Sequence, residues 1–163
     1  MKLFLVYPGL GKTFSAKVNP NVLEVQVGMF RDLDRSQLGD HYPENLKGKE
    51  REEQLNPDFP NNLNKFLAKE ENKNKIVVMA LKQNNIQFAI DNGYDIAFVM
   101  PTKNKLIQLK KQYKERGNTE EYIARQINMY EPTLKKIKQF TYPILFVEEG
   151  QYLLDLINLG IIQ

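Results

Sequence analysis

The chain contains no cysteine and a single histidine, His41, among its 163 residues. Without cysteine it has no disulfides, no thiolate zinc site and no cysteine nucleophile. One histidine cannot build a histidine-rich metal site or a relay of two imidazoles. The metal chemistry that remains is ligation by oxygen, and Mg²⁺ is the ion that suits it best.

Long apolar runs and a strong charge of one sign are also missing. No run approaches the roughly 18 apolar residues of a membrane span, and the apolar residues 3–7 are too few for a secretion signal. The formal net charge is only +3, from 23 Lys and Arg against 20 Asp and Glu, which does not indicate nucleic-acid binding. We therefore expect one cytoplasmic domain over residues 1–163, with neither a membrane nor a nucleic acid as partner.

Five short apolar runs of strand length are separated by segments long enough for helices. The runs cover residues 3–7, 22–27, 75–80, 95–100 and 144–147. This alternation predicts an α/β protein with an open parallel sheet. Apolar spacing and capping residues predict helices at 13–17, 61–71, 81–92, 103–115 and from about 118. Residues 31–60 show no sustained period, and we expect irregular structure there.

A glycine-rich segment joins the first apolar run to the first expected helix. Its residues are Pro8, Gly9, Leu10, Gly11, Lys12 and Thr13. Glycines let backbone N–H groups turn inward around phosphate oxygens, and the following helix start adds partial positive charge. Lys12 would then reach the β- and γ-phosphates of a nucleotide, and Thr13 would offer its hydroxyl to Mg²⁺. The alternative is a plain strand-to-helix turn with a solvated Lys12.

The Pro-Gly-x-Gly-Lys form of this segment resembles the phosphate loop of adenylate kinase and related P-loop nucleoside monophosphate kinases, small phage-encoded relatives included. Pro8, Gly9, Gly11 and Lys12 match, whereas Val6 and Thr13 stand where many adenylate kinases have glycine. The resemblance, with right-handed crossovers, implies a three-layer αβα P-loop fold whose parallel sheet has the order 2-3-1-4-5. It also implies an acceptor-binding segment at about 31–60 and a small lid at about 113–126.

Two carboxylates, Asp32 and Asp34, follow the second apolar run. In an extended segment, residues two apart point the same way, so both would address one Mg²⁺ shell or one acceptor hydroxyl. We assign Asp32 with Thr13 to the metal, and Asp34 to the acceptor as a candidate base. Shikimate and gluconate kinases look similar at this place. The alternative is a solvated acidic turn balanced by Arg31 and Arg35.

Two arginines, Arg116 and Arg125, lie between the fourth and fifth apolar runs, with Gly117 as a candidate hinge. In nucleoside monophosphate kinases this stretch is the lid and carries paired arginines, so the resemblance implies that both act on the transferring phosphate. A helical residue that pairs with Glu121 is the alternative for Arg125.

The function that we expect is ATP- and Mg²⁺-dependent phosphoryl transfer to a nucleoside or deoxynucleoside monophosphate. Lys12, Asp34, Arg116 and Arg125 are its candidate catalytic residues. Two alternatives stay open. One is a kinase of a hydroxyl acceptor, such as a nucleoside or small metabolite, and the other is a nucleotide-binding protein without catalysis.

Overall fold

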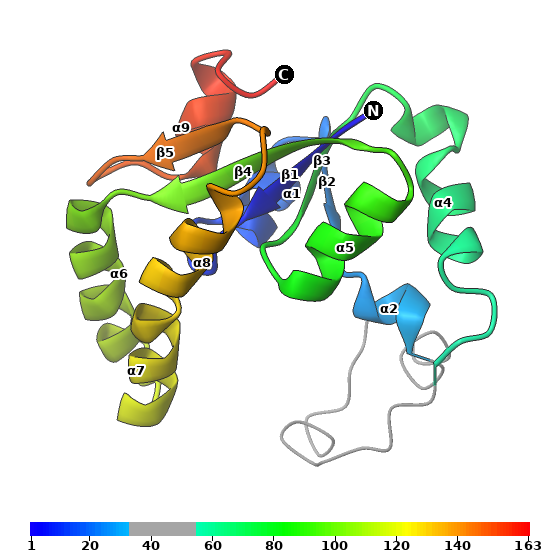
Figure 1. The fold of residues 1–163 in the computed structure, drawn as a ribbon. Helices are drawn as coiled ribbons and strands as arrows, with labels where there is room; N and C mark the ends of the chain where they lie inside the picture. The colour runs from blue at the N-terminus through cyan, green and yellow to red at the C-terminus, as the bar shows by residue number, and fades with distance from the viewer. Residues whose placement is uncertain (33–54) are drawn as a thin grey trace. The chain divides into compact units, whose positions relative to one another are not determined.

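The computed structural model describes residues 1–32 and 55–163 (Figure 1). Five strands form one parallel sheet in the order β2-β3-β1-β4-β5. They are β1 (Lys2–Val6), β2 (Val22–Val25), β3 (Ile76–Ala80), β4 (Asp95–Pro101) and β5 (Ile144–Val147). Strand β1 lies at the centre, and its Leu3 is in register with Val77 of β3 and Ile96 of β4. The predicted α/β fold and strand order are confirmed.

The apolar composition of the central strands explains their position. Leu3, Leu5, Val78 and Val99 are fully buried, because each of these strands is covered on both faces and neither face meets water. Continuous apolar runs of this kind are typical of parallel sheets covered by helices on both sides. This is why the sequence pattern located the strands well.

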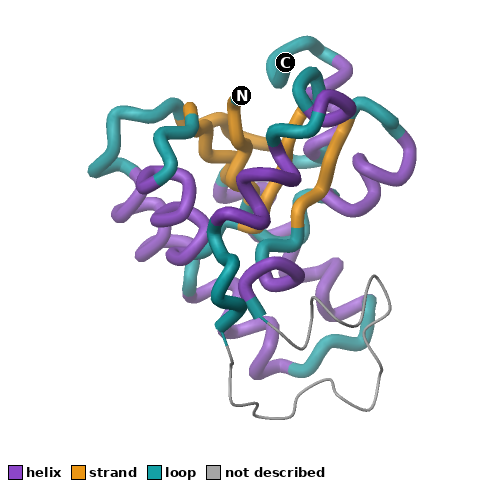
Figure 2. The backbone as a smooth tube through the Cα atoms, turned by 90° about the vertical axis from the view of Figure 1, so that its right-hand side faces the viewer, coloured by secondary structure: helices purple, strands orange, loops and turns teal. Residues whose placement is uncertain are grey.

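Helices flank the sheet, as Figure 2 shows with the helices in purple and the strands in orange. In the part of the chain that carries the sheet they are α1 (Lys12–Val18), α5 (Gln83–Asp91), α6 (Lys103–Glu115), α7 (Glu120–Asn128), α8 (Tyr130–Ile137) and α9 (Leu153–Asn158). Helices α1 and α9 contact each other on one face, and α5 and α8 cover the other (Figure 1). Right-handed crossovers produce this division, because the chain moves in opposite directions from β1 to β2 and from β3 to β4.

Helix starts follow the capping residues of the sequence. Thr102 caps α6, where its hydroxyl accepts the backbone N–H of Lys105, and Thr119 caps α7 in the same way through Tyr122. Pro132 lies in the first turn of α8, a position where a missing N–H costs no helical hydrogen bond. Pro132 therefore belongs to a helix that is separate from α7.

The chain divides into two compact units, residues 1–24 with 76–163 and residues 25–75. The second unit contains α2 (Gly28–Arg31), α4 (Asn61–Leu67) and the 3₁₀ helix η2 (Glu70–Asn72). Its own contacts include the Phe30 and Phe66 rings, 5.1 Å apart, and the buried Leu63 and Leu67. The expected acceptor-binding segment, about 31–60, falls within the residue range of this unit.

Several boundaries differ from those expected. Strand β2 ends at Val25, and the short helix α2 takes up the residues that follow. Helix α4 ends at Leu67, before the predicted 71, because the chain tightens into η2 and the buried Asn72 side chain donates to the Phe66 carbonyl. Apolar spacing carries no information about such a local side-chain bond.

Candidate nucleotide-binding site

The glycine-rich loop of residues 8–13, named the phosphate loop for its predicted role, leaves the carboxyl end of the central strand β1. Gly9 and Gly11 have φ angles of +84° and +89°, the left-handed region that glycine enters without steric cost. Gly9 also lies against Tyr113 of α6, where a Cβ atom would overlap the tyrosine hydroxyl. Both glycines are therefore required by the backbone path, and that path turns the chain from the strand into α1.

Hydrogen bonds from three helices hold this loop in place. The Tyr113 hydroxyl donates to the Pro8 carbonyl at 3.0 Å, and the backbone N–H of Leu153, the first residue of α9, donates to the Leu10 carbonyl at 2.9 Å. In α1 itself, the Ser15 hydroxyl donates to the Gly11 carbonyl at 2.9 Å. Leu10 is fully buried beneath the loop. The loop carbonyls are thus bonded inward to the protein, as a rigid anion cradle requires.

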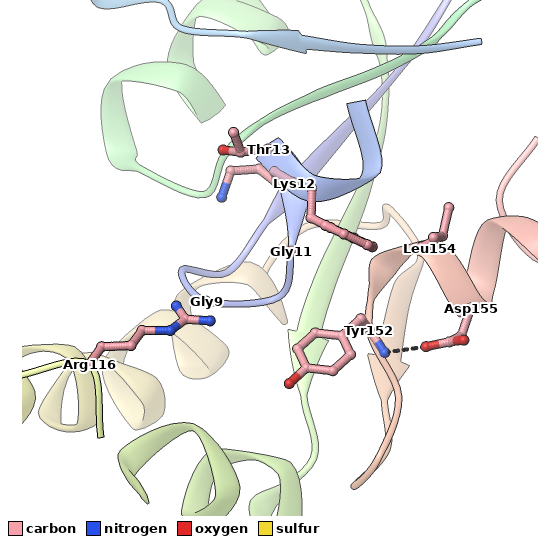
Figure 3. Close-up of a pocket in the computed structure, with 9 residues that line it drawn as sticks. Gly9, Gly11, Lys12, Thr13, Arg116, Tyr152, Leu154 and Asp155 are labelled. Carbon is pink, nitrogen blue, oxygen red and sulfur yellow. Dashed lines mark hydrogen bonds between the residues drawn. The ribbon is translucent and has the colours of Figure 1, made fainter. Parts of the chain in front are cut away.

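A cavity of about 670 Å³ opens beside the loop (Figure 3). Its lining consists of Gly9, Gly11, Lys12, Thr13, Phe14, Arg116, Tyr152, Leu154 and Asp155. The first five belong to the phosphate loop and α1, and Arg116 follows α6, whereas the last three come from the start of α9. A volume of this size lies within the range of small-molecule sites, about 300–1,000 Å³.

Lys12 is the charged side chain that the phosphate loop contributes to the cavity lining. Burial lowers the pKa of its ammonium, while Glu24 of β2 acts to raise that pKa and Lys82 acts to lower it. Glu24, Lys12 and Lys82 follow or belong to three neighbouring strands, whose carboxyl ends meet at one edge of the sheet. Lys12 therefore lies in a partly dehydrated place with one charge of each sign nearby.

Tyr152 forms another wall of the cavity and is held at several atoms. Its ring lies 3.7 Å from the Nζ atom of the buried Lys105, measured to the ring centroid. Its hydroxyl accepts a hydrogen bond from the Gln112 side chain, and its backbone N–H donates to the Asp155 carboxylate at 2.7 Å. Figure 3 shows the Tyr152 ring near Gly11 of the phosphate loop and its backbone N–H directed at the Asp155 carboxylate.

The two arginines of the expected lid have different surroundings. Arg116 is exposed and lines the cavity, directly after the end of α6. Arg125 is also exposed, but its guanidinium lies over the Tyr122 ring at 5.7 Å and is not among the lining residues. The structure thus brings Arg116 together with the phosphate loop, and it does not do so for Arg125.

The carboxylates of the sequence interpretation are only partly described. Asp32 belongs to the second unit and is 8% exposed. Its carboxylate accepts a hydrogen bond from Arg31 Nε at 2.7 Å. Asp34 lies outside the described residues, as do Arg35 and His41. Thr13 lines the cavity with its exposed side chain. Its assignment to Mg²⁺, and that of Asp32, stay predictions.

Sequence reasoning missed the residues that α9 contributes. Tyr152, Leu154 and Asp155 follow β5 and the residues Glu148, Glu149 and Gly150, and no motif in the sequence marks their side chains as part of a cavity. Lys105 was missed because a lysine in the first turn of a helix is normally solvated. Glu24 interrupts an apolar strand, and that interruption was the one available signal for it.

Comparison of the sequence with protein-family models and with curated proteins finds no match. Within residues 1–32 and 55–163, no helix is both long and apolar enough to cross a membrane. The same residues contain no group of three or more His, Asp or Glu side chains placed to hold a metal ion.

Proposed function

We propose that this protein binds Mg²⁺-ATP in the cavity beside the phosphate loop and transfers the γ-phosphoryl group to a nucleoside or deoxynucleoside monophosphate. The observation that carries the proposal is the loop itself. Gly9 and Gly11 adopt left-handed conformations between a buried strand and a helix, and Lys12 lines the adjoining cavity. Backbone N–H groups and a lysine in that arrangement suit the phosphates of a nucleotide.

The charges of the cavity support transfer as well as binding. Phosphoryl transfer depends on positioning and on cations that stabilise the charge of the moving group. Lys12 and Arg116 line the same cavity and supply two positive charges. Because burial has already removed part of the water around Lys12, its interaction with a phosphate is stronger than it would be in bulk solvent.

The α9 wall of the cavity suits a nucleobase. Tyr152 presents an aromatic ring there, and Leu154 adds an apolar side chain. A base stacks on an aromatic ring with an energy of about 1–3 kcal/mol. A cavity lined both by phosphate donors of the loop and by an aromatic ring fits a nucleotide better than it fits inorganic phosphate.

The described residues also fit Mg²⁺ that arrives with the nucleotide. Mg²⁺ prefers oxygen ligands and usually keeps several waters, with one or two protein ligands and substrate phosphates. The Thr13 hydroxyl is an oxygen ligand on the cavity wall. When bound, Mg²⁺ would neutralise charge on the β- and γ-phosphates. Because the proposed reaction consumes ATP, we propose that it takes place in the cytoplasm.

The acceptor is tested by measuring ADP release with Mg²⁺-ATP over a panel of nucleosides and their monophosphates. We expect release that depends on one or a few monophosphates. Release with nucleosides alone would replace this proposal with a hydroxyl-acceptor kinase, in which Asp34 would be the base. ATP binding without release for any acceptor would leave a nucleotide-binding protein and would contradict the kinase proposal.

A further inference from the structure

Lys105 is a buried lysine next to the cavity, although it is not part of the lining. It is 0% exposed in the first turn of α6. Its Nζ atom donates to Gln108 Oε1 at 2.7 Å and lies 3.7 Å from the centroid of the Tyr152 ring. The same Gln108 oxygen accepts the backbone N–H of Gly150 at 3.2 Å, in the loop that leads to Tyr152.

An ammonium in this position destabilises the folded state compared with an apolar side chain of similar length. Removing its charge from water is unfavourable, and burial accordingly lowers the pKa of Lys105. Asp155 and Glu149 act in the other direction and favour the charged form. A methionine would fill the same space without that penalty. The charge therefore has a use that packing alone does not explain.

We argue that the charge of Lys105 helps to fix the orientation of the Tyr152 ring. The Gln112 side chain donates to the ring hydroxyl, and the backbone N–H of Tyr152 donates to Asp155. A Cβ atom on Gly11 would lie 3.5 Å from Cδ1 of the ring, so the phosphate loop passes close to it. Lys105 supplies the remaining restraint, because a cation is attracted to the face of an aromatic ring.

We propose that Lys105 is a positioning residue whose ammonium, held against the Tyr152 ring by Gln108, fixes that ring as the platform on which the base of the donor nucleotide stacks. The inference rests on the proposed function, since it assumes that a nucleotide occupies the cavity. Its consequence is selective: Lys105 strengthens the binding of ligands that carry a base. The phosphates, which contact the loop, bind equally well without it.

The test compares Mg²⁺-ATP with Mg²⁺-tripolyphosphate, which has the phosphates without the base, by calorimetry. The variants are Lys105→Met, Tyr152→Leu and the double variant, and Lys110→Met, an exposed lysine of the same helix, is the control. We expect Lys105→Met to weaken ATP binding about three- to tenfold, from the size of a cation–π contact, and to leave tripolyphosphate binding unchanged. In the Tyr152→Leu background, Lys105→Met is expected to cause no further loss.

The experiment distinguishes a failure of the proposed function from a failure of the role of Lys105. A parent protein that binds neither ligand contradicts the proposed function and, with it, this inference. If the parent binds ATP, equal losses for both ligands, no loss, or the same loss in the Tyr152→Leu background contradict the role of Lys105 alone. Should Lys105→Met fail to fold, Lys105→Gln, which keeps a polar group near Gln108, provides the same comparison.

Discussion

Lys12 and its two charged neighbours form a small electrostatic unit at the edge of the sheet. Burial disfavours the charged form of Lys12, and Lys82 adds to that effect, whereas Glu24 opposes it. A lysine that binds phosphate must be protonated when the nucleotide arrives. Because Glu24 raises the pKa of Lys12, it keeps Lys12 charged over a wider range of pH.

Glu24→Gln tests this role through the pH dependence of ATP binding. Without the Glu24 carboxylate, the pKa of Lys12 falls further, so the alkaline loss of ATP affinity moves to lower pH. Lys82→Gln is the matched variant, and it is expected to move the same loss to higher pH. Binding measured against pH for both variants checks the prediction, and shifts in the same direction would contradict it.

Tyr113 is a second titratable residue at the loop, where its hydroxyl donates a hydrogen bond to the Pro8 carbonyl. Burial, with a smaller contribution from Tyr122, raises the pKa of its hydroxyl to about 12, while Arg116 acts against the rise. In the unfolded chain a tyrosine ionises near its ordinary pKa of about 10. Since the unfolded state loses the proton first, the contribution of Tyr113 to stability is complete below pH 10 and declines as the pH rises towards 12.

Tyr113→Phe is therefore expected to be less stable than the parent by about 1 kcal/mol near neutral pH, because the Pro8 carbonyl loses its donor. The difference should shrink as the pH rises above about 10. Denaturant unfolding of both proteins at several pH values measures it. Tyr122→Phe, which keeps the neighbouring ring, is the control and should change stability little. A constant difference between parent and Tyr113→Phe up to pH 12 would exclude the assigned pKa.

At the scale of elements, α6 and α9 shape the site as much as the glycine-rich loop does. Helix α6 bonds to Pro8 through Tyr113, and α9 bonds to Leu10 through its first backbone N–H. The loop itself was predictable, because strand, glycines, lysine and helix start are contiguous in the sequence. The α9 wall was not, because no pattern in the sequence marks the contacts that Tyr152 makes with Gln112 and Lys105.

Gly9→Ala tests the close approach of the loop and α6. Alanine at φ +84° is strained, and its Cβ would also displace the Tyr113 hydroxyl, so we expect a loss of about 2–4 kcal/mol in stability. Gly93→Ala is the matched control, because Gly93 has a φ of +68° with no atom within 4 Å of the added Cβ. It should cost about 1 kcal/mol, from strain alone. Equal losses for the two variants, compared by thermal unfolding, would rule out a tight contact between Gly9 and Tyr113.

At the scale of the whole molecule, the strand order was predictable and the local boundaries were less so. Continuous apolar runs located β1, β3 and β4, and the strand order followed from the resemblance to P-loop kinases together with the handedness of crossovers. The end of α4 depends on the side chain of Asn72, and the surroundings of Arg125 depend on Tyr122, which no period in the sequence reveals. Such details follow from tertiary contacts and not from pattern.

We propose that Lys12 of the phosphate loop acts on the phosphoryl group during its transfer. The most direct measurement is the maximal rate of ADP release by Lys12→Ala, with Lys17→Ala, an exposed lysine of the same helix outside the cavity, as the control. We predict a loss of about 10²–10³-fold for Lys12→Ala and a rate near that of the parent for Lys17→Ala. A folded Lys12→Ala protein that releases ADP at the parent rate would contradict the account.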